Sequence, residues 1–87
     1  MLEELLGKAI VADLRSPYVC LGTLKRYDDL YLELRNADFH DLRDTQTTRE
    51  NYVAASRSTG VKRNRKRIFL VRAEIVALSL LEDVVDE

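Results

Sequence analysis

Residues 7–15 read Gly-Lys-Ala-Ile-Val-Ala-Asp-Leu-Arg, and this stretch sets the fold of the chain. From Ile10 to Leu14 every second residue is apolar or small, which is the period of a half-buried β-strand. Ser16-Pro17 then interrupts the alternation and turns the chain back. The first element of regular structure after Gly7 is therefore predicted to be a strand over 8–15.

Four more strands are predicted downstream, and a short helix upstream. Gly22 lies inside the second strand, where a small, sharply bent barrel needs a bulge or kink. Asn36 to Asp38 is the expected point of curvature in the third strand, which can continue as far as Leu42. The predicted elements are a helix over 1–6, with Leu2, Leu5 and Leu6 on one face, and strands over 18–27, 30–42, 67–72 and 75–81.

The fifth predicted strand is apolar at nearly every position except Ser79. A strand that is apolar on both faces is normally covered on both faces, and an 87-residue chain has little material for this. An exposed apolar edge also invites pairing with another chain. We therefore expect this strand to pair with the fourth strand of a second copy, head to tail, which can close into a ring.

The segment 44–66 is predicted to be a long basic loop, because it lacks a clear strand pattern. Thr47 and Glu50 have the spacing of a capping box, so a short helix over 49–56, ending near Gly60, is also expected. Between Thr45 and Arg67 seven cations face one anion. The local charge of +6 contrasts with a net charge of -1 for the whole chain, so the charge is unevenly distributed.

Length and composition indicate one domain over 1–87 with an acidic tail at 82–87. The single cysteine, Cys20, excludes an internal disulfide, and its apolar surroundings indicate a buried small hydrophobe. No apolar run reaches the length of a membrane span, and the N-terminus lacks a signal-peptide pattern. We expect a cytoplasmic protein with no membrane association.

Two short motifs stand out along the chain. The first comprises residues 7–15, then Gly22-Thr-Leu24 and Tyr27-Asp28; the second is Val71-Arg-Ala-Glu-Ile-Val76. Together, and in this order, they resemble the two motifs of the Sm-like proteins. The resemblance covers 2–42 and 68–81 and excludes the basic segment between them. It implies an all-β fold, a small, strongly bent, five-stranded SH3-like (Sm-fold) barrel preceded by a short N-terminal helix.

The resemblance also implies a function. Sm-like proteins form rings, mostly of six or seven subunits, and bind single-stranded RNA around the central pore. Carried over to this sequence, the base pocket would comprise Asp28, Tyr31 and Arg72. Here Tyr31 takes the place of the family's asparagine, Ala73 replaces a glycine, and Pro17 replaces a turn glycine.

A second candidate RNA contact is the basic run after Gly60, which could neutralise several phosphates, multiplied by the number of subunits in a ring. It could equally be a solvated loop. Its members are Lys62, Arg63, Arg65, Lys66 and Arg67.

Three functions remain open: an RNA-binding ring, a ring that scaffolds proteins without binding RNA, and a monomeric SH3-like adaptor. The acidic total charge and the missing asparagine favour the second, whereas the apolar fifth strand argues against the third. We expect no enzyme, no cofactor and no metal site, because adjacent Asp28 and Asp29 point apart and no nucleophile accompanies them. His40 is expected to have no catalytic role.

Overall fold

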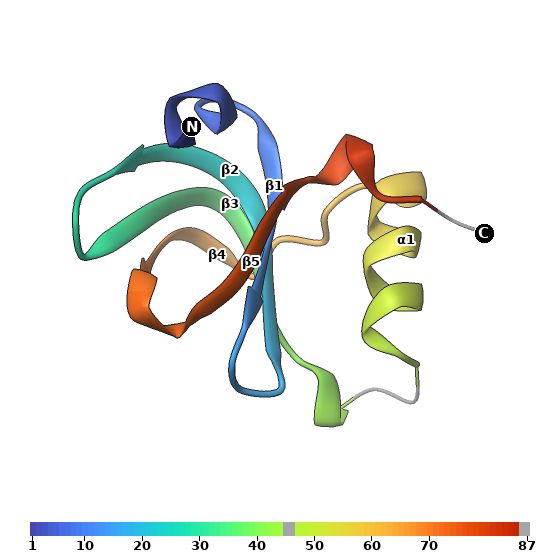
Figure 1. The fold of residues 1–87 in the computed structure, drawn as a ribbon. Helices are drawn as coiled ribbons and strands as arrows, with labels where there is room; N and C mark the ends of the chain where they lie inside the picture. The colour runs from blue at the N-terminus through green and yellow to red at the C-terminus, as the bar shows by residue number, and fades with distance from the viewer. Residues whose placement is uncertain (45–46, 86–87) are drawn as a thin grey trace.

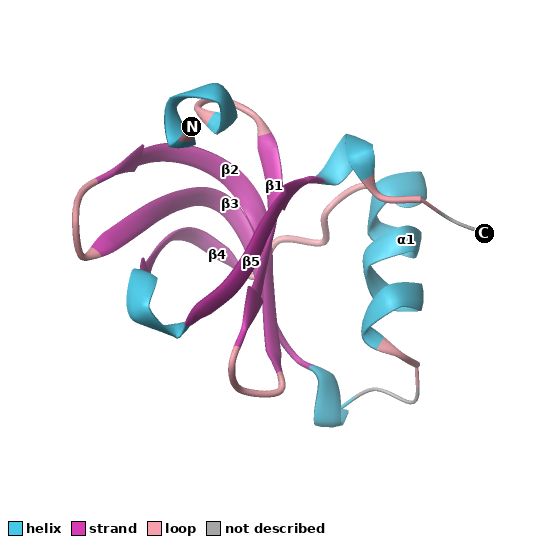
Figure 2. Cartoon of the chain, viewed as in Figure 1, coloured by secondary structure: helices cyan, strands magenta, loops and turns pink. Residues whose placement is uncertain are grey.

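The computed structural model describes residues 1–44 and 47–85, which form five antiparallel strands, one α-helix and four 3-10 turns (Figures 1 and 2). In the sheet the strands lie in the order β4-β3-β2-β1-β5. This confirms the predicted strongly bent five-stranded sheet. The strands are β1 (Ala9–Leu14), β2 (Tyr18–Tyr27), β3 (Tyr31–Asp41), β4 (Arg65–Val71) and β5 (Ile75–Leu80).

The predicted bend occurs where β2 crosses β3. The register between these strands shifts between Leu21 and Thr23, and a Cβ atom on Gly22 would lie 3.0 Å from the Cβ of Ala37. Opposite this point Asn36 has a φ of 50°, in the left-handed region. The absence of a side chain at Gly22 lets the two strands approach closely while both curve. The two predicted points of curvature are therefore confirmed.

The concave side of the sheet holds the main core. Leu24, Leu32 and Leu34 are fully buried there, together with Ile10 and Cys20. Leu2 and Leu5 of the first 3-10 turn, η1 (Leu2–Leu5), pack against this core. Burial raises the pKa of the Cys20 thiol to about 12, and the nearby Asp38 carboxylate adds to the effect. Cys20 is thus a neutral core residue, as the sequence predicted.

The segment predicted as a basic loop contains an eleven-residue helix, α1 (Arg49–Thr59), followed by Gly60. Its N-cap is Thr48, whose hydroxyl accepts a hydrogen bond from the Asn51 N–H at 3.1 Å. The capping box predicted at Thr47 is therefore wrong by one residue. Residues 45–46 of the predicted loop lie outside the described residues.

The helix covers the second face of the sheet (Figure 1). Val53 and Ala54 of α1 are buried, and Val53 packs with Val11, Val19 and Leu21 in a second apolar cluster. The fold therefore has two apolar layers with the sheet between them. This packing stabilises α1 beyond its weak intrinsic preference and explains why the helix is longer than the sequence predicted.

Two leucines are exposed, one from the helix predicted over 1–6 and one from the strand predicted over 30–42. Leu6 is 39% exposed because η1 ends before it and Gly7 turns the chain with a φ of 76°. Leu30 is 66% exposed because it belongs to the turn before β3. Its side chain therefore does not follow the alternation of Leu32 and Leu34.

The two outer strands of the sheet, β4 and β5, each pair with one neighbour among the described residues. Both strands carry exposed apolar side chains: Val76 on β5 is 66% exposed, and Phe69 and Val71 on β4 are each 48% exposed. The short turn η3 (Arg72–Glu74) joins the two strands, and a last turn, η4 (Leu81–Asp83), follows β5 with Leu81 buried. The expectation of an uncovered fifth strand is therefore only partly confirmed: β5 pairs with β1, and Ile75, Leu78 and Leu80 pack against the main core, whereas its outer edge and Val76 are left open within one copy of the chain.

Candidate functional site

The turn between β2 and β3 is held by the carboxylate of Asp28. One carboxylate oxygen accepts hydrogen bonds from the N–H groups of Leu30 and Tyr31, each at 2.8 Å. These bonds favour the charged carboxylate, so the pKa of Asp28 is lowered from its ordinary value. Asp28 is exposed, and its remaining acceptor positions are available at the surface.

Arg72 connects this turn to the β4–β5 turn. Its N–H donates to the carbonyl of Leu30 at 2.8 Å, and its guanidinium donates to the carbonyl oxygen of Asp28. Two segments distant in sequence are thereby fixed against each other. The structure thus places all three residues of the predicted base pocket, Asp28, Tyr31 and Arg72, around one turn.

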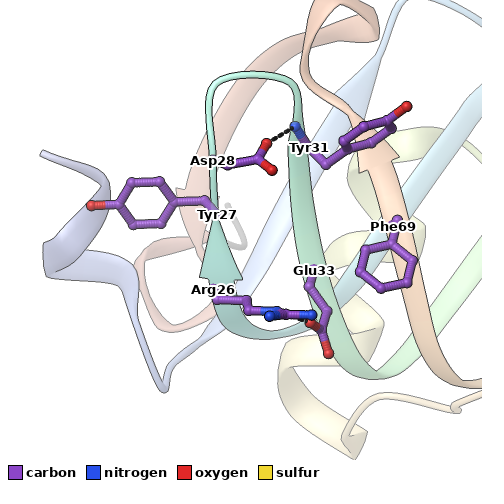
Figure 3. Close-up of a pocket in the computed structure, with 6 residues that line it drawn as sticks. All are labelled: Arg26, Tyr27, Asp28, Tyr31, Glu33 and Phe69. Atoms are coloured by element: carbon purple, nitrogen blue, oxygen red, sulfur yellow. Dashed lines mark hydrogen bonds and ion pairs between the residues drawn. The ribbon is translucent and has the colours of Figure 1, made fainter.

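A surface pocket of about 240 Å³ lies beside this turn (Figure 3). Arg72 does not line it; instead it lines a hollow between η1 and β5. Asp28 and Tyr31 lie at one end of the pocket, and Arg26 and Glu33 at the other. Tyr27 points away from the rest, and its hydroxyl donates to Glu3 at 3.4 Å. The lining residues are Arg26, Tyr27, Asp28, Tyr31, Glu33 and Phe69.

Glu33 is the most deeply placed ionised group of the pocket, with only 2% of its side chain exposed. Its carboxylate accepts from Arg35 at 2.6 Å and from Arg26, its neighbour across the β2–β3 pair. The hydrogen bonds from Arg35 and then Arg26 lower the pKa of Glu33, which therefore stays ionised. Glu33 thus holds two arginines at the pocket and neutralises part of their charge.

The exposed rings of Tyr31 and Phe69 form an aromatic wall of this pocket. Tyr31 is 44% exposed and pairs with Val71 across β3 and β4, while Phe69 pairs with Glu33 in the same register. The guanidinium of Arg67 lies 5.2 Å from the centre of the Phe69 ring. Exposed rings next to arginines are suited to stack on planar, electron-rich ligands such as nucleobases.

The predicted basic loop is divided between two elements. Lys62 and Arg63 lie in the connection after α1, whereas Arg65, Lys66 and Arg67 belong to β4. This corrects the prediction of a loop over 44–66, since β4 begins two residues before the predicted strand. Arg63 donates to the side chain of Asn36 at 2.7 Å, and Arg65 donates to the carbonyl of Asn64 at 3.2 Å.

The sequence did not identify Arg26, Glu33 or Phe69 as members of the site. Glu33 occupies the polar position of an alternating strand, where a solvated side chain is the usual case. The available signal was the presence of two arginines near Glu33 in the sequence, Arg26 seven residues before it and Arg35 two residues after it. The approach of Arg26 to Glu33 depends on a shift in the β2–β3 register between Leu24 and Arg26, which no sequence pattern indicates.

Among residues 1–44 and 47–85, no group of three His, Cys, Asp or Glu side chains could hold a metal ion. Over the same residues no helix has the length and apolar character needed to cross a membrane.

The fold is similar to that of a solved protein. The structure superposes on an Sm protein from Pyrococcus abyssii, solved in complex with a uridine heptamer, with a TM-score of 0.61. The alignment covers 90% of this chain and 89% of the other, at 19% sequence identity. The chain has an Sm-like fold.

The resemblance of the sequence motifs and the likeness of the structure therefore agree on an Sm-like fold. Comparison by sequence alone finds no matching family model and no matching curated protein. At 19% identity the likeness establishes the fold of the chain and not its ligand.

Proposed function

We propose that the chain assembles into a homo-oligomeric ring, most simply of six or seven copies, that binds single-stranded RNA. The observation that carries the RNA proposal is the pocket at the β2–β3 turn, where exposed Tyr31 and Phe69 lie beside arginine side chains. The Sm-like fold supports it, since the solved protein with this fold is in complex with a uridine heptamer.

The outer strands support assembly. β4 and β5 leave backbone groups unpaired on one side of each strand, within the described sheet, and both present exposed apolar residues. A hollow of about 600 Å³ lies along β5 and η1, lined mainly by apolar side chains such as Leu5, Val76 and Leu78. If β4 of a second copy paired with β5, the open edge would be satisfied and the apolar surface covered. Repetition of this head-to-tail contact gives a ring.

The RNA contact would combine stacking of bases on aromatic rings with the attraction of phosphates to cations. Tyr31, with Phe69 beside it, offers a stacking surface worth about 1–3 kcal/mol per base. Exposed cations, among them Lys66 and Arg67, attract phosphates, and each copy in a ring adds its own set. Arg72 holds the turn that carries Tyr31, so we assign it a positioning role in the same site.

Filter binding of a short oligo-uridine RNA to the purified oligomer, at several salt concentrations, tests the proposal. We expect measurable affinity at low salt and a loss of affinity as ionic strength rises. Single-stranded DNA of the same length controls for contacts to the RNA 2′-hydroxyl. Absence of binding at low salt would contradict an RNA function.

One observation favours the alternative of a protein-interaction scaffold that binds no RNA. Glu33 pairs with both Arg26 and Arg35, so the pocket presents less free positive charge than its sequence suggests. An intact ring that fails to bind RNA would favour this alternative. In either case we propose a binding protein rather than an enzyme, acting in the cytoplasm, where the reduced state of the buried Cys20 is maintained.

A further inference from the structure

A second pocket lies far from the β2–β3 turn, between α1 and the end of β3. Its volume is about 360 Å³, within the range of small-ligand sites. Its helical wall lies in the segment that the Sm motifs do not cover, while Asp38 and His40 lie on β3 outside the quoted motif residues, so the motifs assign the pocket no role. Its main polar residues are Asp38 and His40 on β3, Asn51 and Tyr52 on α1, and Lys62 after the helix.

One of the residues that line the pocket, His40, has a ring nitrogen with no partner among the described residues. His40 stacks on Tyr52, with ring centres 4.1 Å apart and an angle of 27° between the planes. The Nε2 atom of His40 is buried and makes no hydrogen bond to any described residue. Leaving such an atom unpaired costs about 1–3 kcal/mol, so a ligand or water that reaches it is favoured.

Asp38 provides a buried carboxylate in the same pocket. Only 4% of the residue is exposed, and burial raises its pKa. The side-chain amide of Asn64 donates to one of its oxygens at 3.2 Å. A carboxylate has about four acceptor positions, so Asp38 can accept further donors. Asp38 and His40 are two residues apart on β3 and therefore project to the same side of the strand.

We propose that this pocket binds a guanine nucleotide. Guanine is the base that presents two adjacent donors, N1–H and the N2 amino group, which match the two oxygens of a carboxylate. Its O6 and N7 atoms can accept a hydrogen bond from an imidazole N–H. The bound base can select the tautomer of His40 that carries the hydrogen on Nε2. The His40–Tyr52 pair supplies an aromatic wall, and exposed Lys62 at the rim can meet a phosphate.

The other bases fit less well. Adenine and cytosine each place an acceptor nitrogen beside their amino group, which would face the Asp38 carboxylate with a lone pair. Uracil offers one donor between two carbonyl oxygens. A bidentate contact of a side chain with the correct base discriminates by about tenfold or more. The pocket is complete within one copy of the chain, so this inference does not depend on the ring.

Isothermal titration of the full chain with GMP, AMP, CMP and UMP tests the inference. We expect GMP to bind at least about tenfold more tightly than the other three. A short oligo-uridine RNA with one guanosine, compared with GMP, separates the two sources of the base. Tighter binding of this RNA than of GMP and of plain oligo-uridine indicates a guanosine in RNA, and equal binding of GMP and the RNA indicates the free nucleotide. Equal affinity for all four nucleotides, or no binding of GMP, would overturn the proposal.

The variant Asp38→Asn provides a sharper test. The amide replaces one acceptor with a donor, so GMP affinity should fall by about tenfold or more, whereas XMP, which has a carbonyl at C2, should gain affinity. Asp41→Asn on the same strand makes the same charge change outside the pocket and should leave GMP binding unchanged. Circular dichroism checks that both variants are folded. Retention of the GMP preference in Asp38→Asn would refute the assignment.

Discussion

Tyr31 and Glu33 are two residues apart on β3 and have opposite effects at the pocket of the β2–β3 turn. Tyr31 exposes an aromatic face, and Glu33 withholds positive charge by pairing with Arg26 and Arg35. Alternation along the strand places both side chains on the convex side of the sheet, away from Leu32 and Leu34. Substitution of each residue separates stacking from charge.

Replacing Tyr31 by Ala should weaken RNA binding by about 1–3 kcal/mol, because the stacking surface is lost. The expected loss in affinity is roughly 5–150-fold in a filter-binding assay. Tyr31→Phe retains the ring and should bind nearly as well as the unchanged protein. If Tyr31→Ala and Tyr31→Phe bind alike, stacking at this position plays no part.

Replacing Glu33 by Gln should have the opposite effect, because Arg26 and Arg35 lose their carboxylate partner and can meet phosphates. We expect higher RNA affinity at low salt, and a steeper dependence on salt, by about 0.7 in slope for each arginine that gains a phosphate. Glu50→Gln, on the exposed surface of α1, removes the same charge elsewhere and controls for net charge. An equal gain in both variants would show that net charge alone is responsible.

Cys20 predicts a specific pH dependence of stability. Its pKa is raised from 9.0 to about 12 by burial, so between these values the unfolded chain has released a proton that the folded chain retains. The free energy of unfolding therefore falls with rising pH, by at most about 1.4 kcal/mol per unit from this group.

Cys20→Ala lacks this contribution, so its deficit in stability relative to the unchanged protein should shrink as the pH rises above about 9. Urea unfolding of both proteins between pH 7 and 10.5 measures it. A deficit that stays constant with pH would show that the thiol is not shielded.

The helix α1 shows most clearly how far the sequence could predict the elements. The strands followed from alternation, and the bend from Gly22, because both are local properties of the chain, whereas the pairing of β1 with β5 is not local and was not predicted. The extent of α1 was underestimated, since its stability depends on Val53 and Ala54 packing onto β1 and β2. Asp28 and Tyr31 could be predicted from a turn motif, whereas Glu33 and Phe69 required a cross-strand register.

The N-cap of α1 can be tested directly. Thr48→Ala removes the hydroxyl that accepts from the Asn51 N–H and should lower the free energy of unfolding by about 0.5–2 kcal/mol. Ser58→Ala, at an exposed position of the same helix, should change it by less than about 0.5 kcal/mol. Urea unfolding followed by circular dichroism measures both. Equal effects of the two substitutions would argue against Thr48 as the cap.

For the molecule as a whole, the open outer edges of β4 and β5 govern the expected behaviour. A single copy leaves Val76 on β5 and Phe69 and Val71 on β4 exposed, on strands whose outer sides pair with no described residue. Such edges favour association. Head-to-tail pairing of β4 of one copy with β5 of the next would provide hydrogen-bond partners for the outer edges of both strands. The proposed arrangement of RNA sites in a ring depends on this contact, whereas the pocket between α1 and β3 does not.

Light scattering at micromolar concentration tests this contact most directly. The unchanged protein should have a mass several times its 10.0 kDa, about 60–70 kDa for six or seven copies. Val76→Lys places a charge on the outer strand and should give folded single copies, while Val85→Lys, at an exposed position after the sheet, should retain the larger mass. A mass of 10.0 kDa for the unchanged protein would contradict the ring.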